Sequence, residues 1–206
     1  MLFYSADFKE THTINAEFDE LMRKNYIEFH ELAGSSTKFT GAEVVLSEGF
    51  VFFWKPPAVF GQWTMSDFEI DGVHYNCAEQ YMMAEKARLF EDHGALSKIL
   101  ASESPRTQKA LGQKVRGFTE KAWRKNREQI VTKGNLAKFS QNSEMREELL
   151  ETGDKTLVEA SPLDRIWGIG LRADDPRVLD PHLWQGLNLL GKALMSVRDA
   201  LRAEGG

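Results

Sequence analysis

Apolar residues recur at spacings of three and four positions over much of the chain, a pattern typical of amphipathic helices. The first such pattern predicts a helix between residues 15 and 32, whose apolar face carries Phe18, Leu21, Met22, Tyr26 and Phe29. Further helices are predicted over about 76–94, 95–102, 105–116, 119–138, 143–151 and 186–201. Most of the chain is therefore expected to be helical.

Short runs of β-branched and aromatic residues between these segments predict strands. The run VVLSEGFVFFW, residues 44–54, predicts a first β element that stops at the following Lys-Pro-Pro. A hairpin is expected to turn at Asp71 and Gly72, and TLVEAS, residues 156–161, predicts a further strand. The next stretch, rich in glycine and proline, is expected to be a loop. The prediction is a single α+β domain that is predominantly helical with a few short strands.

The helix expected over 76–94 has a clear start signal. Asn76 can cap it, Glu79 follows three positions later as in a capping box, and Gly94 suits its end. Seven residues after Glu79, Lys86 lies on the same face, about 10 Å further along the helix axis. Glu79 can therefore either cap the helix or line a site together with Lys86, and Lys86 can equally be solvated.

The composition is that of an ordinary globular protein of 206 residues, of which 42% are hydrophobic and 28% are charged. This length suits one domain. No apolar run approaches the roughly 18 residues of a membrane span, and the first residues lack the features of a signal peptide. The sole cysteine, Cys77, excludes an internal disulfide and a cysteine-rich zinc site. We expect a soluble protein of the cytoplasm or another reducing intracellular compartment.

Charge is distributed unevenly along the chain. The net charge is -5, but the segment from Arg106 to Lys138 carries ten basic residues and two acidic ones. Such a run is either the solvated face of several helices or a surface that attracts phosphate groups.

A second candidate site lies in the sequence DRIWGIG, which begins at Asp164. Its two glycines permit close backbone approach, and Trp167 can stack on a flat ring such as a nucleotide base. Trp167 can equally anchor the core, and Asp164 can cap the turn that begins at Ser161. The chain has no glycine-rich phosphate fingerprint, serine nucleophile elbow or HExxH zinc helix, and its five histidines are scattered without ligand spacing. We therefore expect neither a metal nor a cofactor.

The order of the motifs along the chain is informative as well. The segments FFW, FGQW, CAEQYMMAEKARLF, LGQKVRGF, LLETGDKTLVEASPLDRIWGIG and WQGLNLLGKALMSVR follow one another. Together, from about Val51 to Arg202, they resemble the NADAR family, also called YbiA-like. The resemblance implies a YbiA-like fold for residues 46–206. Residues 1–45 are then an N-terminal extension that we expect to pack on the core.

The resemblance implies an N-glycosidase-type site that acts on ribose attached to a nitrogenous base. Activities of the family include removal of ADP-ribose from guanine bases in nucleic acid and cleavage of phosphorylated ribosylamino-pyrimidine intermediates of riboflavin synthesis. Mapped onto this chain, the implied catalytic residues are Glu79, Lys86 and Asp164. The implied substrate-binding residues are Trp63, Lys138, Trp167, Gly168, Asn188 and Gly191.

These residue types suit cleavage of a C1′–N bond, because departure of the base leaves positive charge on the sugar. Glu79 can stabilise that charge or activate water, and Asp164 can assist the leaving nitrogen or orient the ribose. Trp167 would stack on the base, and Asn188 would hold a ribose hydroxyl or a phosphate. An unprotonated Lys86 could instead attack C1′ and form a Schiff base with the opened ribose.

The preferred hypothesis is an N-glycosidase that removes ADP-ribose from guanine, with a ribosylamino-pyrimidine phosphate as the second choice of substrate. The expected partner is an ADP-ribose-containing substrate, including ADP-ribosylated nucleic acid, and no membrane. A non-catalytic module that binds ADP-ribose or NAD would need Trp167 and Asn188, but neither Glu79 nor Lys86. A structural helical adaptor is the third hypothesis. The oligomeric state does not follow from the sequence.

Overall fold

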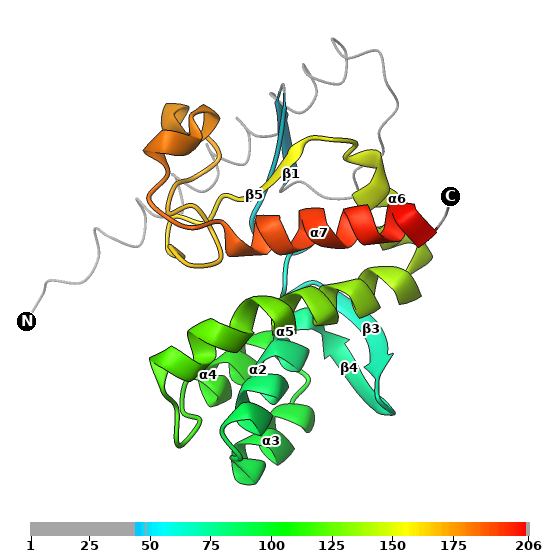
Figure 1. The fold of residues 1–206 in the computed structure, drawn as a ribbon, viewed down its shortest axis with the longest axis vertical. Helices are drawn as coiled ribbons and strands as arrows, with labels where there is room; N and C mark the ends of the chain where they lie inside the picture. Colours follow the sequence, from blue (N-terminus) through cyan, green and yellow to red (C-terminus); the bar gives the residue numbers. More distant parts are fainter. Residues whose placement is uncertain (1–43, 48, 205–206) are drawn as a thin grey trace, which may run out of the picture.

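The computed structural model describes residues 44–47 and 49–204, and Figure 1 shows how their helices and strands are arranged. The strands are β1 (Val44–Ser47), β2 (Phe50–Phe53), β3 (Met65–Ile70), β4 (Val73–Cys77) and β5 (Thr156–Glu159). The α-helices are α2 (Ala78–Leu89), α3 (His93–Leu100), α4 (Pro105–Gly112), α5 (Glu120–Gln141), α6 (Ser143–Glu151) and α7 (Leu189–Glu204). Two short 3-10 helices, η1 (Pro176–Leu179) and η2 (Pro181–Leu183), precede α7. The predicted α+β class is confirmed.

The predicted helix boundaries agree with the observed ones to within a few residues in α3 to α7. Helix α2 differs more, because it ends at Leu89 and not at Gly94. Glu91 adopts a left-handed backbone conformation with φ of 55°, which is incompatible with a continuing helix. The helix predicted over 15–32, and the packing predicted for the N-terminal extension, lie outside the described residues.

A small sheet joins segments that are far apart in the sequence. Its strand order is β1-β2-β5, in which β1 and β2 are antiparallel and β2 and β5 are parallel. The β element predicted over 44–54 is thus two strands, which are joined by a turn at Gly49 with φ of 83°. In the parallel pair, Phe53 lies opposite Glu159. The last residue of β5 is therefore positioned by a strand from the beginning of the described chain.

The second sheet is the hairpin of β3 and β4, and its predicted turn is confirmed. Asp71 and Gly72 both have positive φ, 54° and 77°, as a two-residue type I′ turn requires. The hairpin lies beside α5 (Figure 1), and Lys133 of that helix forms an ion pair of 3.0 Å with Asp71. Because β4 leads directly into α2, the hairpin determines where that helix begins.

The start of α2 corrects the predicted capping box. Cys77, and not Asn76, is the N-cap residue, and its side chain makes no capping hydrogen bond. Asn76 instead uses its side-chain oxygen to accept a hydrogen bond of 3.0 Å from Gln108 of α4. The side-chain oxygen of Gln80 accepts a hydrogen bond of 2.8 Å from the backbone N–H of Asn76. The predicted role of Glu79 in a capping box is therefore wrong.

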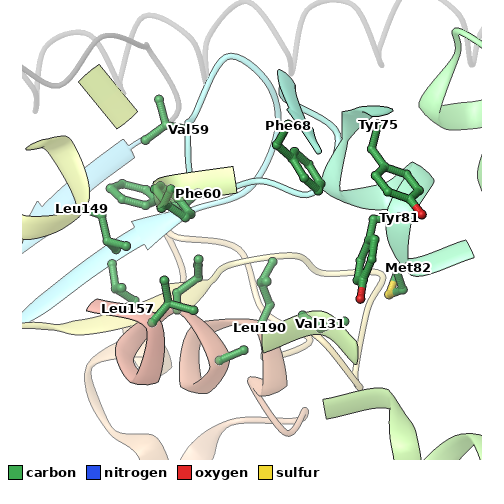
Figure 2. Packing of buried hydrophobic residues seen from close by; sticks show 14 of the residues in the cluster. Val59, Phe60, Phe68, Tyr75, Tyr81, Met82, Val131, Leu149, Leu157 and Leu190 are labelled. Atoms are coloured by element: carbon green, nitrogen blue, oxygen red, sulfur yellow. The ribbon is translucent and has the colours of Figure 1, made fainter. Parts of the chain in front are cut away.

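Two apolar cores lie on opposite faces of the small sheet. Val51 and Phe53 of β2 belong to the larger core, whereas Phe52 between them belongs to the smaller one. Figure 2 shows side chains from the loop after β2, from α6, from β5 and from α7 in the larger core: Phe60, Leu149, Leu157 and Leu190. Strand β5 is thus covered on both faces, and its last residue, Glu159, is fixed at the end of a packed strand.

Helix α7 packs on both β5 and α5, and small residues permit the close approach. A Cβ atom on Gly191 of α7 would overlap the carbonyl oxygen of Leu157 in β5. In the same way, a Cβ atom on Gly134 of α5 would overlap the ring of Tyr81 in α2. These contacts bring α5 close to α2 and α7 close to β5. The start of α2 and the end of β5 carry Glu79 and Glu159.

Candidate active site

The loop that follows β5 folds around the side chain of Asp164. Its Oδ1 accepts hydrogen bonds of 2.8 Å from the backbone N–H groups of Ile166 and Trp167. The backbone N–H of Asp164 donates to Oγ of Ser161 over 3.2 Å. The interpretation of Asp164 as a residue that caps this turn is confirmed, and its catalytic role stays a prediction.

The same loop is held against the end of β5. The backbone N–H of Ile169 donates to the carbonyl of Glu159 over 3.0 Å. A Cβ atom on Gly168 would lie 2.7 Å from that carbonyl oxygen, so glycine is needed for this approach. Trp167 is half-buried and packs against the larger core. This supports its role as a core anchor, and stacking on a base stays a prediction.

Asn188 ties α7 to the end of β5. Its side-chain oxygen accepts a hydrogen bond of 3.1 Å from the N–H of Glu159, and its side-chain nitrogen donates to the carbonyl of Leu157 over 2.9 Å. The residue is 1% exposed, so its side chain offers almost no surface to a ligand. The geometry thus gives Asn188 a positioning role, and its contact with ribose or phosphate stays a prediction. Gly191 likewise serves the packing of α7 on Leu157.

Glu79, the second residue of α2, is a buried acid without an ion pair among the described residues. Its backbone N–H donates to the carbonyl of Gln62 over 2.9 Å, whereas its Oε1 is buried and has no hydrogen-bond partner in residues 44–47 and 49–204. Burial raises the pKa of Glu79 to about 7, and Lys109 and a hydrogen bond from the indole of Trp63 oppose this shift. The carboxyl can therefore change its protonation near neutral pH.

Glu159 is an acid that the sequence did not single out. It ends β5, and its Oε2 is buried without a hydrogen-bond partner among the residues that the structure describes. Burial raises the pKa of Glu159 to about 8, Asp164 and Glu79 add to the shift, and Lys109 opposes it. We call Glu79, Glu159 and Asp164 the carboxylate cluster. The available signal in the sequence was a glutamate at the end of the apolar strand TLVE, which places a charge at the edge of the core.

Trp63 and Lys109 border the carboxylate cluster. Lys109 of α4 places its Nζ 5.7 Å from the centre of the Trp63 ring, and it lowers the pKa of both Glu79 and Glu159. Lys109 is exposed and Trp63 is half-buried, so the cluster adjoins the molecular surface on this side. Trp63 thus lies where a substrate-binding residue is expected, and Lys109 is a second residue that the sequence did not single out.

Lys86 lies two turns along α2 from Glu79 and is half-buried. Its Nζ is 4.3 Å from the ring centre of Phe118 and 5.5 Å from that of Trp123. Burial lowers the pKa of Lys86, and the charges of Glu120 and Glu79 oppose this shift. A lowered pKa is the direction that a nucleophilic amine requires. The covalent role of Lys86 stays a prediction.

Lys138 is bonded to the backbone of a neighbouring loop, and its contact with substrate stays a prediction. Its Nζ donates to the carbonyls of Val59 over 2.6 Å and of Gly61 over 3.0 Å, and the residue is 0% exposed. Burial lowers the pKa of Lys138 to about 7. The side chain therefore fastens the loop that carries Trp63 to α5, which is a positioning role.

Two members of the basic segment are paired with acidic residues. Arg116 forms an ion pair of 2.9 Å with Asp92, and Lys133 pairs with Asp71 at the tip of the hairpin. Both positive charges are thus partly neutralised at separate places. Lys109 is the member of the segment whose charge acts on the carboxylate cluster.

The cluster is suited to acid–base chemistry at a polar bond. Two buried carboxyls can exchange protons near neutral pH, and their ionised forms can stabilise positive charge on a bound molecule. Among residues 44–47 and 49–204, no group of three or more His, Cys, Asp or Glu side chains is placed to hold a metal ion. No helix in the described part of the chain is long and apolar enough to cross a membrane.

Several known proteins are similar to this chain in sequence. The family model of the NADAR domain matches residues 52–202. The chain is 47% identical to N-glycosidase R617 of Acanthamoeba polyphaga mimivirus over 146 residues, which cover 68% of this chain and 86% of that protein. It is 33% identical to N-glycosidase Npun_R5314 of Nostoc punctiforme over 153 residues, which cover 74% of this chain and 91% of that protein.

One solved structure is similar to this chain in fold. The NMR structure of the E. coli protein YbiA matches with a TM-score of 0.65 and 27% sequence identity, over 82% of this chain and 94% of that one. The predicted YbiA-like fold is therefore confirmed. The chain belongs to the NADAR family.

Proposed function

We propose that this chain is an N-glycosidase, which hydrolyses the bond between C1′ of a ribose and a nitrogen of a base. One observation carries the proposal: Glu79 is 3% exposed, and its buried Oε1 has no hydrogen-bond partner within the described part of the chain. A buried acid with one unpaired oxygen among the described residues and a raised pKa is typical of a functional site. The relatives named N-glycosidases support the same reaction.

Glu79 suits the charge that develops in this reaction. As the C1′–N bond lengthens, positive charge builds on the ribose ring, and a carboxylate beside C1′ stabilises it. The same carboxylate can take a proton from the water molecule that attacks C1′. With its pKa near 7, Glu79 is partly ionised at neutral pH, and Lys109 and Trp63 favour that form.

The proposed substrate is ADP-ribose attached to guanine in nucleic acid. Lys109 supports this choice, because it is exposed, borders the carboxylate cluster and offers positive charge to a diphosphate. The ring of Trp63, next to Lys109, offers a face on which a base can stack. A ribosylamino-pyrimidine phosphate is the second candidate substrate, and it places a smaller demand on cationic groups because it carries one phosphate.

A non-catalytic module that binds ADP-ribose or NAD is the candidate from another class. It would hold the ligand without using the Glu79 carboxyl, so Glu79→Gln would leave its function intact. The two functions therefore differ in a measurable way, since a module of this kind binds ADP-ribose but releases none from a substrate.

The experiment is to incubate the chain with a DNA oligonucleotide that carries ADP-ribosylated guanine and, separately, with the ribosylamino-pyrimidine phosphate. Mass spectrometry would follow the released sugar. We expect release of ADP-ribose, at least ~100-fold slower in Glu79→Gln. Glu151→Gln, an exposed acid at the end of α6, is the matched control and should keep the wild-type rate. Release from neither substrate, together with binding of ADP-ribose in calorimetry, would favour the non-catalytic module.

A further inference from the structure

The backbone of Glu159 is held from both sides. Its N–H donates to Asn188 over 3.1 Å, and its carbonyl accepts from the N–H of Ile169 over 3.0 Å. On the neighbouring strand, Phe53 lies opposite it in the parallel register. These contacts fix the point from which the side chain extends. The fold thus presents this acid in one place, as a catalytic group requires.

The side chain itself contributes little to that arrangement. Its Oε2 is buried and has no hydrogen-bond partner among the described residues. A buried polar oxygen without a partner costs stability, and the amide of glutamine would fill the same volume. The carboxyl of Glu159 is therefore better explained by what it does to a bound molecule than by what it does for the fold.

Three charged groups face this carboxyl. Asp164 and Glu79 add negative charge, and Lys109 adds positive charge. Burial is the largest influence, and it raises the pKa of Glu159 to about 8, above the value of about 7 for Glu79. Two neighbouring acids that differ in this way hold one proton between them near neutral pH, and the environment favours Glu159 as its carrier.

We propose that Glu159 is a further catalytic residue, the general acid that protonates the base nitrogen as the bond from that nitrogen to C1′ breaks. This inference rests on the proposed N-glycosidase activity. The leaving nitrogen keeps the electron pair of the broken bond and receives the proton of Glu159. The oxygen of a water molecule forms the new bond to C1′, and ionised Glu79 takes a proton from that water. Afterwards Glu79 releases its proton to solvent and Glu159 regains one.

Asp164 is less suited to the role of proton donor. Its Oδ1 accepts two backbone N–H groups and thereby shapes the loop. Glu159, by contrast, has a buried oxygen that no donor in the described part of the chain occupies. The structure therefore separates a loop-shaping acid, Asp164, from a proton-donating acid, Glu159.

The test compares two leaving groups on the same ADP-ribose, namely guanine and 4-nitrophenol. Nitrophenolate departs without a proton, whereas the guanine nitrogen needs one. We expect Glu159→Gln to slow cleavage of the guanine compound at least ~100-fold and to keep cleavage of the nitrophenol compound within about tenfold of wild type. Glu79→Gln should slow both reactions, and the control Glu151→Gln should slow neither.

The pH–rate profile is a second measurement. Wild type should lose activity on the guanine compound above about pH 8, where Glu159 loses its proton, and this alkaline limb should be absent from Glu159→Gln. A Glu159→Gln variant with the wild-type rate, an equal loss for both leaving groups or an unchanged alkaline limb would overturn the inference.

Two further measurements distinguish failure of this inference from a folding defect of the variant and from failure of the proposed function. If Glu159→Gln does not fold, Glu159→Asp keeps an acid at this position, and it should retain the alkaline limb at a reduced rate. A folded Glu159→Asp variant without that limb would overturn the inference as well. A wild-type chain that cleaves neither compound would contradict the proposed function instead.

Discussion

Two acids of the carboxylate cluster, Glu79 and Glu159, each have a buried oxygen that no donor in the described residues occupies. Each such group costs folding free energy, because a carboxyl loses its hydration on burial. The chemistry proposed for the cluster depends on that cost, since burial is also the largest cause of the raised pKa values. At the residue scale, function and stability are therefore opposed.

Glu79→Gln should reverse that cost in a pH-dependent way. The pKa of Glu79 is raised from 4.5 to about 7, so the folded chain binds more protons than the unfolded chain within this interval. Stability contributed by the protonated form is then present below pH 4.5 and is lost as the pH rises through 7. Urea denaturation at pH 5 and pH 8 should show that Glu79→Gln gains stability over wild type as the pH increases. A variant that becomes less stable than wild type at pH 8 would indicate a structural role for the carboxylate.

The covalent role of Lys86 is tested by reductive trapping. Its pKa is lowered by burial, which raises the fraction of unprotonated amine available to attack C1′. Incubation with substrate and a borohydride reductant should attach a ribose derivative to the peptide that contains Lys86, and Lys86→Ala is the control. Absence of the adduct, together with substantial activity of Lys86→Ala, would leave attack by water as the route. An adduct at Lys138 is not expected, because that side chain is fully buried.

The two tryptophans of the site should respond differently to truncation. Trp63 is half-buried beside Lys109 and Glu79, so Trp63→Ala should weaken ADP-ribose binding by about 1–3 kcal/mol with a small change in melting temperature. Trp167 packs on the larger core, so Trp167→Ala should lower the melting temperature, and it should weaken binding as well if the ring stacks on a base. Calorimetric binding and thermal unfolding of both variants give the comparison. Unchanged affinity in Trp63→Ala would contradict its placement in the binding site.

At the scale of elements, local patterns predicted most of the helices and the hairpin turn at Asp71 and Gly72. They failed where a side chain makes a distant contact. Asn76 does not cap α2, because its side chain bonds to Gln108 of α4. The place of Glu159 in the site was not predicted. Glu159 comes near Glu79 only because β5 pairs with β2, a strand far earlier in the chain. The spacing of residues along one helix or strand cannot predict a contact between two distant elements.

The packing of α7 on β5 gives a prediction at this scale. Gly191→Ala should destabilise the fold by about 1–3 kcal/mol, because the new methyl group would overlap a rigid backbone carbonyl, that of Leu157. Gly112→Ala is the matched control, because its methyl group would meet the side chain of Met83, which can move. Urea midpoints of the two variants should therefore differ, with Gly191→Ala the lower. Equal midpoints would indicate that α7 can shift away from β5.

At the scale of the whole molecule, the carboxylate cluster draws on three parts of the fold. Glu79 comes from the start of α2, Glu159 from the end of β5, and Asp164 from the loop that follows it (Figure 1). The resemblance to a family predicted Glu79 and Asp164 as site residues. It could not distinguish residues that contact substrate from residues that position the site. Asn188 and Lys138 both bond to the backbone and position the strand and loop around the cluster, whereas their expected contact with substrate stays a prediction. A matching motif therefore identifies residues important for the site, and the structure shows which contacts each of them makes within the fold.

The most direct measurement is a single-turnover reaction with the chain in excess over an oligonucleotide that carries ADP-ribosylated guanine. Mass spectrometry would count both products, ADP-ribose and the unmodified oligonucleotide. We predict that wild type releases them in equal amounts and that Glu79→Gln does so at least ~100-fold more slowly. Equal rates for wild type and Glu79→Gln would contradict the assignment of the reaction to the carboxylate cluster.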